Sequence, residues 1–364
     1  MPVGKNPSFG NPKSADMIKT TIVALGLALV VVGTATAART LDIYFIDVEG
    51  GQSTLIVTPA GQSLLVDTGY PDLNGRDPDR IMAAAKDAHI RRIDYLVITH
   101  FHEDHDGGAA ELARRLPIAA FVDYGSPIQT EPDVVAAFAA YSQARERGAH
   151  VVPAPGDRLP LRGLDVEILS AGGLTLAKAV DGAGRANPAC ATFERRADNT
   201  SENPRSVSLR VRYGAFRFLD LGDLVWNKLA DLVCPDDLIG ESDVYLLAHH
   251  GNGDANVAPL LAAVHPRVAV MNNGAYKGGS ASQFASLHRL PDLEDVWQLH
   301  KSEADGADNF ADAYIANLVD GPKDGAAWIK LSARDDGSFS VVNGRTGFRK
   351  DYGRTSEKRS RVRQ

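Results

Sequence analysis

The amino-acid sequence predicts an α/β fold in which two mixed β-sheets pack together and helices flank them, giving a four-layer αββα sandwich. Two patterns support this. Apolar runs occur in hairpin pairs, such as 53–57 and 63–66 around a Pro59-Ala60-Gly61 turn. Other runs alternate with helical stretches, as 93–98 does, which is typical of parallel strands buried on both faces. With 364 residues and 44% hydrophobic content, the chain can form one large domain.

The first half of the chain contains strands interrupted by helices. A β-rich run at 41–48 ends in a Glu49-Gly50-Gly51 turn, and the alanine-rich stretch 80–88 predicts a helix. Further elements are expected after the strand at 93–98, namely helices at 107–115 and 133–147 and strands at 119–122, 150–152 and 164–169.

The second half begins with a segment of a different kind. Residues 171–203 are rich in Gly, Ala, Pro and Asn, which predicts a long loop, and such loops are uncommon unless they are functional. Apolar and β-branched runs then predict the remaining strands, at 207–213, 216–219, 244–247, 268–271, 327–332 and 338–342.

The two ends of the chain differ from the body, which we place at 38–348. Lys19, the apolar run 20–33 and Ala35-Thr36-Ala37 are typical of a secretory signal peptide, here with a short polar extension before it, so 1–37 is expected to be removed. The alternative is an uncleaved membrane anchor, although the run is short for a membrane span. We expect a periplasmic or secreted protein without stable membrane insertion after cleavage.

The charge distribution limits the partners. The chain has a net charge of −7, yet residues 349–364 contain seven Lys/Arg and two acidic residues, so the body is more acidic than the whole. An acidic body repels a polyanion, which argues against tight sequence-independent nucleic-acid binding. We expect the basic tail 349–364 to be disordered. The two cysteines, Cys190 and Cys234, allow a disulfide in an exported protein, but the sequence leaves their pairing open.

One stretch concentrates metal-binding residue types. His100, His102, Asp104 and His105 fall within six residues, between a predicted buried strand and a predicted helix. In extended geometry His100 and His102 face the same side, and a turn after them lets Asp104 and His105 reach a second ion. Imidazole and carboxylate ligands suit Zn²⁺, with Mn²⁺ or Fe²⁺ as alternatives.

The pattern His-x-His-x-Asp-His followed by Gly-Gly resembles the signature of the metallo-β-lactamase superfamily. Three further landmarks of this family appear in order, each after a predicted strand: Asp67-Thr68-Gly69, Leu221-Gly222-Asp223 and Ala248-His249-His250-Gly251. The resemblance extends from residue 41 to about 345. Within the superfamily the chain is most similar to the nuclease-like domain of ComEC-type competence proteins and to phosphorylcholine esterases, on the segments 47–53 and 203–209 and the histidine pair.

The resemblance implies a set of site residues. The metal ligands would be His100, His102, Asp104, His105, Asp223 and His250, which together hold two divalent ions. Asp104, His249 and Asp67 would be the catalytic residues: Asp104 acts as a ligand, His249 contacts a substrate oxyanion, and Asp67 holds the metal-binding loop by hydrogen bonds. The roles of His249 and His250 could be reversed, since adjacent residues of a strand point to opposite faces.

The sequence departs from the family pattern at one ligand. Many members have a lone histidine between the second motif and the bridging aspartate, and here only His150 lies in that interval. We interpret His150 as structural, which leaves the first metal with His100, His102 and Asp223 and leaves its occupancy open. His300, at the end of a short strand, could reach the cleft or be structural.

The resemblance implies an exported metal-dependent hydrolase in which a metal-bridged hydroxide attacks the substrate. Similarity to ComEC-like proteins and phosphorylcholine esterases favours phosphoesters of the phosphodiester type, including small molecules. The alternatives are a lactone, thioester or β-lactam hydrolase of the same fold, a mono-iron sulfur dioxygenase, and a non-catalytic binding relative. Export argues against the dioxygenase, which would need a reducing compartment, and the complete ligand set argues against loss of catalysis.

Overall fold

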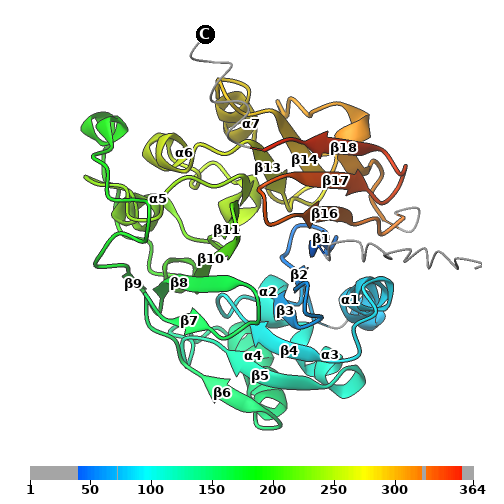
Figure 1. Ribbon diagram of the computed structural model, residues 1–364. Helices are drawn as coiled ribbons and strands as arrows, with labels where there is room; N and C mark the ends of the chain where they lie inside the picture. Colours follow the sequence, from blue (N-terminus) through cyan, green and yellow to red (C-terminus); the bar gives the residue numbers. More distant parts are fainter. Residues whose placement is uncertain (1–39, 72, 322–324, 355–364) are drawn as a thin grey trace, which may run out of the picture. The chain divides into compact units, whose positions relative to one another are not determined.

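The computed structural model describes residues 40–71, 73–321 and 325–354, all within one unit, 38–364. The described residues form two nine-stranded mixed sheets with flanking helices, so the predicted fold class is confirmed (Figure 1). In this part of the chain no helix is long and apolar enough to cross a membrane. The predicted signal peptide lies outside the described residues.

The first sheet combines the two ends of the described chain. Its strand order is β18-β17-β16-β1-β2-β3-β4-β5-β6, with β1 paired antiparallel to β16 and the run from β3 to β6 parallel. The strands are β1 Leu41–Phe45, β2 Thr54–Val57, β3 Ser63–Val66, β4 Ile93–Val97, β5 Ile118–Val122, β6 Ala149–Val151, β16 Ile329–Ala333, β17 Phe339–Asn343 and β18 Arg349–Tyr352.

The second sheet is built from the middle of the chain. Its order is β15-β14-β13-β12-β11-β10-β8-β7, with β9 beside β8, and β11 to β15 are parallel. The strands are β7 Arg158–Leu159, β8 Asp165–Ala171, β9 Leu174–Thr175, β10 Ser208–Tyr213, β11 Phe216–Asp220, β12 Val244–Leu246, β13 Val268–Met271, β14 Asp295–His300 and β15 Ile315–Asn317.

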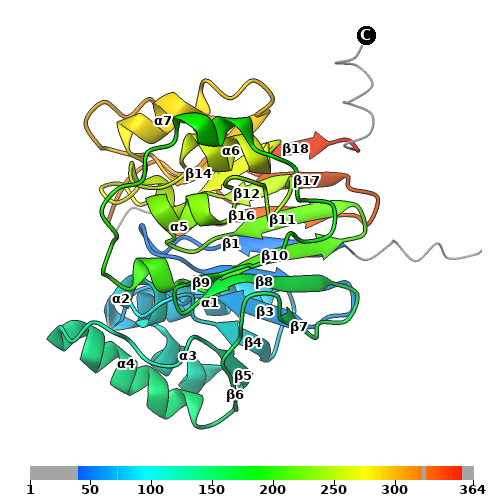
Figure 2. The same cartoon turned by 90° about the vertical axis from the view of Figure 1, so that its left-hand side faces the viewer.

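Helices cover the outer faces of both sheets. Figure 2 shows α1 to α4 on the side of β3 to β6, and α5 to α7 at the opposite side of the molecule. The α-helices are α1 Arg76–Asp87, α2 Glu103–Asp106, α3 Ala109–Arg115, α4 Pro132–Arg145, α5 Trp226–Asp231, α6 Ala258–Val264 and α7 Ala281–Leu287. The 3₁₀ turns are η1 Leu73–Gly75, η2 Pro188–Thr192, η3 Asn203–Arg205, η4 Ala248–Gly251 and η5 Asp312–Tyr314.

Side-chain alternation along the strands creates three separate cores. Because successive strand residues face opposite sides, β1 sends Ile43 and Phe45 into the core between the sheets and Tyr44 into the core under α1, α3 and α4. In β11, Phe218 packs against Phe45 between the sheets, while Leu219 joins the core under α5 to α7. These three apolar layers separate the four structural layers.

Three predicted boundaries are wrong. Asp104 and His105 lie in the one-turn helix α2 rather than in a loop, and the helix predicted from Gly107 begins at Ala109. The predicted tail 349–364 starts inside a strand, because Arg349–Tyr352 pairs with β17 and buries the Tyr352 ring against Phe339. The composition of the tail is basic, but this buried aromatic ring overrides that signal. Residues 355–364 lie outside the described residues.

Candidate metal centre

The site lies where strands of both sheets end. Asp67 directly follows β3, His100 comes three residues after β4, Asp223 three residues after β11, and His249 three residues after β12. Within each sheet these strands are parallel, so their carboxyl ends share one edge. The edges of the two sheets thus bring four distant loops together.

Four side chains form a compact buried cluster. Single ligand atoms of Asp104, His105, Asp223 and His250 all lie within 4.8 Å of one another. Asp223 Oδ2 is 3.3 Å from His105 Nε2 and 3.2 Å from His250 Nε2, and Asp104 Oδ2 is 3.1 and 3.3 Å from the same two nitrogens. None of the four residues is more than 6% exposed.

The atoms of this cluster face a common point instead of satisfying one another. Although they lie close to carboxylate oxygens, His105 Nε2 and both ring nitrogens of His250 make no aligned hydrogen bond among the described residues, and neither does Asp223 Oδ1. Buried polar atoms left without partners are costly. Two carboxylates and two imidazoles suit a divalent cation, so the donor set fits the metal site that the sequence predicts.

Asp67 orients His105 from behind. Its carboxylate accepts hydrogen bonds of 2.7 Å from the backbone N–H and the hydroxyl of Thr99 and lies 2.7 Å from His105 Nδ1. Holding Nδ1 in this way leaves Nε2 directed at the cluster. Burial raises the pKa of Asp67, and the neighbouring His105 opposes that rise.

The charges of the clustered carboxylates and imidazoles shift one another's pKa values. Burial disfavours the charged form of His105, but Asp223, Asp104 and Asp67 outweigh it and raise the pKa of this imidazole well above its usual range. Burial would likewise raise the pKa of Asp223, yet His250 and the neighbouring histidines hold it well below its usual range. The same balance lowers the pKa of Asp104. The carboxylates therefore stay ionised, as cation ligands must.

His100 and His102 form a second group beside the cluster. His100 Nε2 is 2.9 Å from His102 Nδ1 and 3.8 Å from Asp223 Oδ2. The outer nitrogen of His102 lies 2.9 Å from Gln129 Oε1. Burial, followed by the charge of His105, lowers the pKa of His100 well below its usual range, so this ring is neutral and able to bind a metal. Asp223 is shared by both groups.

His249 and His250 reach the site through an unusual backbone. Both residues have left-handed conformations, with φ of 51° and 55°, which are strained for non-glycine residues. As a result both rings turn towards the site: His250 joins the cluster, and His249 Nε2 lies 3.8 Å from Asp223 Oδ2 and 3.3 Å from Asn203 Nδ2. Asp254 holds the other nitrogen of His249 at 2.8 Å. Burial disfavours charge on His249, but Asp223 and Asp254 raise its pKa.

Lys277 is a site residue that the sequence analysis missed. Its ammonium group lies 2.5 Å from Asp104 Oδ2 and 3.1 Å from the Tyr70 hydroxyl. The following loop passes so close to His250 that a Cβ on Gly278 would lie 2.2 Å from the His250 carbonyl oxygen, so only glycine fits there. A lone lysine 26 residues after Gly251, the end of the last motif, carries no sequence signal, because its position at the site depends on this loop packing.

The other candidate histidines lie in separate contacts. His150 bonds to Asp123 at 3.0 Å and Arg145 at 3.2 Å on the edge strand β6, which agrees with its structural interpretation. His300 is buried, with Nε2 3.0 Å from Asp47 Oδ1. These contacts of His150 and His300 do not involve any of the six predicted ligands.

Comparison with known proteins gives concordant matches. A sequence profile described as the Metallo-beta-lactamase superfamily matches residues 46–178. A competence protein, ComA, from Neisseria gonorrhoeae is 28% identical over 239 residues, covering 63% of this chain. A hydroxyacylglutathione hydrolase from Anaeromyxobacter dehalogenans is 34% identical over 103 residues, covering 28% of this chain. The matches span 27% and 37% of the lengths of these two relatives.

Solved structures with related folds were also found. The metallo-beta-lactamase fold protein YhfI from Bacillus subtilis aligns with a TM-score of 0.41 and 9% identity, over 71% of this chain and 96% of that protein. Zn²⁺-bound PqqB from Methylobacterium extorquens aligns with a TM-score of 0.38 and 12% identity, over 64% and 89% of the two chains.

Proposed function

Because the chain belongs to the metallo-β-lactamase superfamily, we propose that it is an exported, binuclear metal-dependent hydrolase acting on phosphoesters of the phosphodiester type. One observation supports this above all: four buried ligand atoms from three separate chain segments lie within 4.8 Å of one another. Burying these unpaired carboxylate and imidazole groups together would be costly in a protein that binds no cation there.

The geometry supports the following ligand roles. His105, His250 and Asp104 would hold one ion, His100 and His102 the other, and Asp223 would be shared between them. Ions bound there, Zn²⁺ or alternatively Mn²⁺ or Fe²⁺, would supply Lewis-acid charge and lower the pKa of a coordinated water. Asp67 would fix the ring of His105, and His249, held by Asp254, would contact an oxyanion of the substrate.

The preference for phosphoesters rests on charge and on relatives. Lys277 places a cation beside Asp104 at the rim of the cluster, with its side chain 38% exposed, where it would attract the negative oxygens of a phosphoryl group. The sequence also resembles ComEC-like proteins and phosphorylcholine esterases, and a competence protein is among its relatives.

Export is supported by two independent features. The N-terminal sequence has the charged, apolar and small-residue segments of a signal peptide. Cys190 and Cys234, whose pairing the sequence left open, form a disulfide, and disulfides persist mainly in oxidising compartments such as the periplasm.

A second candidate function is thioester hydrolysis. The relative that is 34% identical over 103 residues is named a hydroxyacylglutathione hydrolase, and the same arrangement of carboxylates and imidazoles could serve an acyl transfer to water. The acidic body does not distinguish the two functions.

A substrate panel with metal analysis tests the proposal. Purified mature protein should contain two divalent ions by mass spectrometry and hydrolyse bis-p-nitrophenyl phosphate faster than a hydroxyacyl thioester, a lactone or nitrocefin. His102→Ala and Asp104→Ala should each lose activity, while Arg158→Gln, a change on β7 away from the cluster, should not. Wild-type turnover in both ligand variants, or turnover of the thioester alone, would refute the phosphoesterase assignment.

A further inference from the structure

A groove of about 420 Å³ is lined by chain neighbours of residues that hold the site histidines. Ile128 precedes Gln129 and Pro204 follows Asn203, and both Ile128 and Pro204 line the groove. Gln129 bonds His102, and Asn203 contacts His249. Trp226, which lines the groove, also donates its backbone N–H to the carbonyl of Asp254 at 3.0 Å, and Asp254 holds His249. The groove wall is therefore bonded to residues that support His102 and His249.

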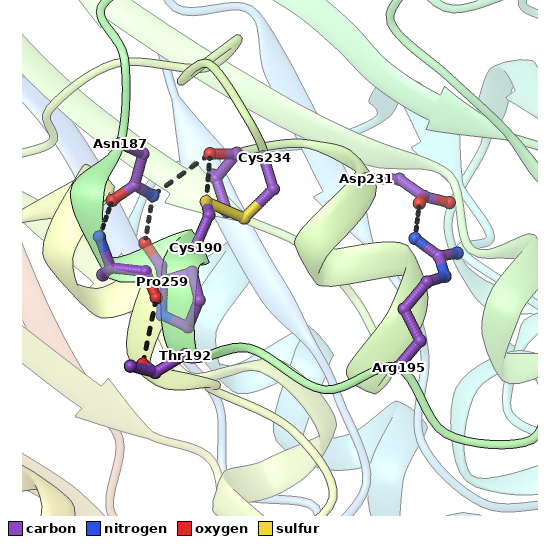
Figure 3. Close-up of a disulfide and its surroundings, with 9 residues drawn as sticks. Asn187, Cys190, Thr192, Arg195, Asp231, Cys234 and Pro259 are labelled. Atoms are coloured by element: carbon purple, nitrogen blue, oxygen red, sulfur yellow. Dashed lines mark hydrogen bonds and ion pairs between the residues drawn. A yellow bond between two sulfur atoms is a disulfide. The ribbon is translucent and has the colours of Figure 1, made fainter.

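The outer wall of the groove is a firmly held segment of the long loop. Its base is tied to the end of α5 by the Cys190–Cys234 disulfide, and Arg195 reaches Asp231 at 2.8 Å (Figure 3). Further along, Asn227 exchanges hydrogen bonds with the backbone of Arg196 at 3.0 and 2.8 Å. The wall is thus rigid enough to position a ligand.

The groove contains an unmatched cation. Arg205 lines the groove, and its guanidinium donates a hydrogen bond of 3.2 Å to the carbonyl of Gly172. No carboxylate of the described residues lies within ion-pair distance of its guanidinium, whereas Arg195 and Lys228 share Asp231 at 2.8 and 3.6 Å. A cation without a counter-ion in an acidic protein suits an anionic ligand.

A second, independent feature, at Asn203, also points to a ligand. Asn203 is only 6% exposed, and its Oδ1 has no hydrogen-bond partner among the described residues. Its Nδ2 faces His249 at 3.3 Å, and the next two residues, Pro204 and Arg205, line the groove. A donor group of a bound substrate would satisfy the free oxygen.

We propose that this groove is a substrate subsite in which Arg205 binds a second anionic group of a phosphodiester. The inference rests on the proposed function and narrows it: the preferred substrates carry a phosphate or carboxylate on one substituent of the scissile phosphodiester. The positive charge of Arg205 permits this binding despite the acidic body. The attraction between the guanidinium and a bound anion acts over a distance shorter than the Debye length, so salt does not fully screen it.

A matched pair of chromogenic substrates tests the subsite. Thymidine 5′-(p-nitrophenyl phosphate) and its 3′-phosphorylated derivative release the same product and differ by one phosphate. The wild-type protein should favour the derivative in kcat/KM by about tenfold, as one charge-assisted contact provides. Arg205→Gln should bring this ratio close to one, Arg205→Lys should keep part of it, and Arg158→Gln, outside the groove, should keep all of it.

The ratio is an internal control, because misfolding of a variant lowers both rates together. Binding of thymidine 3′,5′-bisphosphate and thymidine 5′-monophosphate, followed by calorimetry, should show the same preference and the same loss in Arg205→Gln. A wild-type ratio near one, or an unchanged ratio in Arg205→Gln, would overturn the subsite. If neither ester is cleaved, the proposed function fails, and the binding preference still decides the subsite.

Discussion

The two groups of candidate ligands, the buried cluster and the pair His100 and His102, differ in how they are held. His105 is buried and fixed through Nδ1 by Asp67, and its Nε2 has no aligned partner. His100 and His102 instead contact each other at 2.9 Å, and His102 also reaches Gln129. A cation entering the first group breaks no aligned hydrogen bond at His105 Nε2, whereas one entering the second must replace the contact between two imidazoles. We therefore expect the first group to bind metal more tightly.

Removing the shared carboxylate should have the largest effect. Because Asp223 belongs to both groups, Asp223→Ala should lose both ions and reduce activity by more than about 100-fold, beyond the loss typical of residues behind a ligand. Elemental analysis and turnover of bis-p-nitrophenyl phosphate measure this. Asp133→Ala, which removes an exposed carboxylate from α4, is the control. Two ions retained by Asp223→Ala would show that Asp223 is not shared.

Changing Asp67, the carboxylate that orients His105, should have the next largest effect. Asp67→Asn replaces the charge that orients His105, so the affinity of the tighter site should fall about 10- to 100-fold. Competition with a chromogenic chelator measures the dissociation constant. The weaker site serves as the reference within the same protein, and an equal loss at both sites would mean that Asp67 supports the whole centre.

The weaker group can be tested alone. His102→Ala should reduce the metal content from two ions to one and leave the tighter ion bound. Gln129→Ala, which frees the outer nitrogen of His102 and the backbone N–H of Glu202, should weaken the second ion by about tenfold. Titration calorimetry of the metal-free protein separates the two binding events. Two ions of equal affinity in the wild-type protein would contradict the difference between the groups.

A buried carboxylate outside both groups should give the smallest effect. Burial raises the pKa of Asp220 from 3.8 to about 7. Between these values the folded protein keeps a proton that the unfolded chain has released, so the free energy of unfolding of the metal-free protein should fall as pH rises, by up to about 1.4 kcal/mol per pH unit. Urea unfolding at pH 5 and pH 6.5 measures this. Asp220→Asn should show a shallower dependence, and an identical slope would exclude Asp220 as its source.

The fold class and the four residues of the buried cluster were predictable because their signals are local. Strands such as Ser63–Val66 and Val268–Met271 have the predicted bounds, since apolar runs between turn residues leave little choice. The motifs at 100–105 and 249–250 each begin three residues after a parallel strand. Parallel strands end at one edge of a sheet, so the strand order was enough to predict that these motifs converge.

The remaining features depend on tertiary packing. The helices α5 to α7 have six or seven residues each, too few for a periodic pattern, and they owe their stability to one shared core. Lys277, Gln129 and Arg205 reach the site or the groove only because distant loops pack together. No spacing in the sequence could indicate these contacts.

The left-handed backbone of His249 and His250 has a consequence for how the protein can change. Each residue costs on the order of 1 kcal/mol relative to a glycine, which adopts this conformation freely. Glycine at the fully buried position 250 would leave a cavity, so the strain could be relieved at a net gain only at His249, whose side chain is 17% exposed. Laboratory evolution under heat without a demand for turnover should therefore replace His249 before His250, leaving a more stable but inert protein.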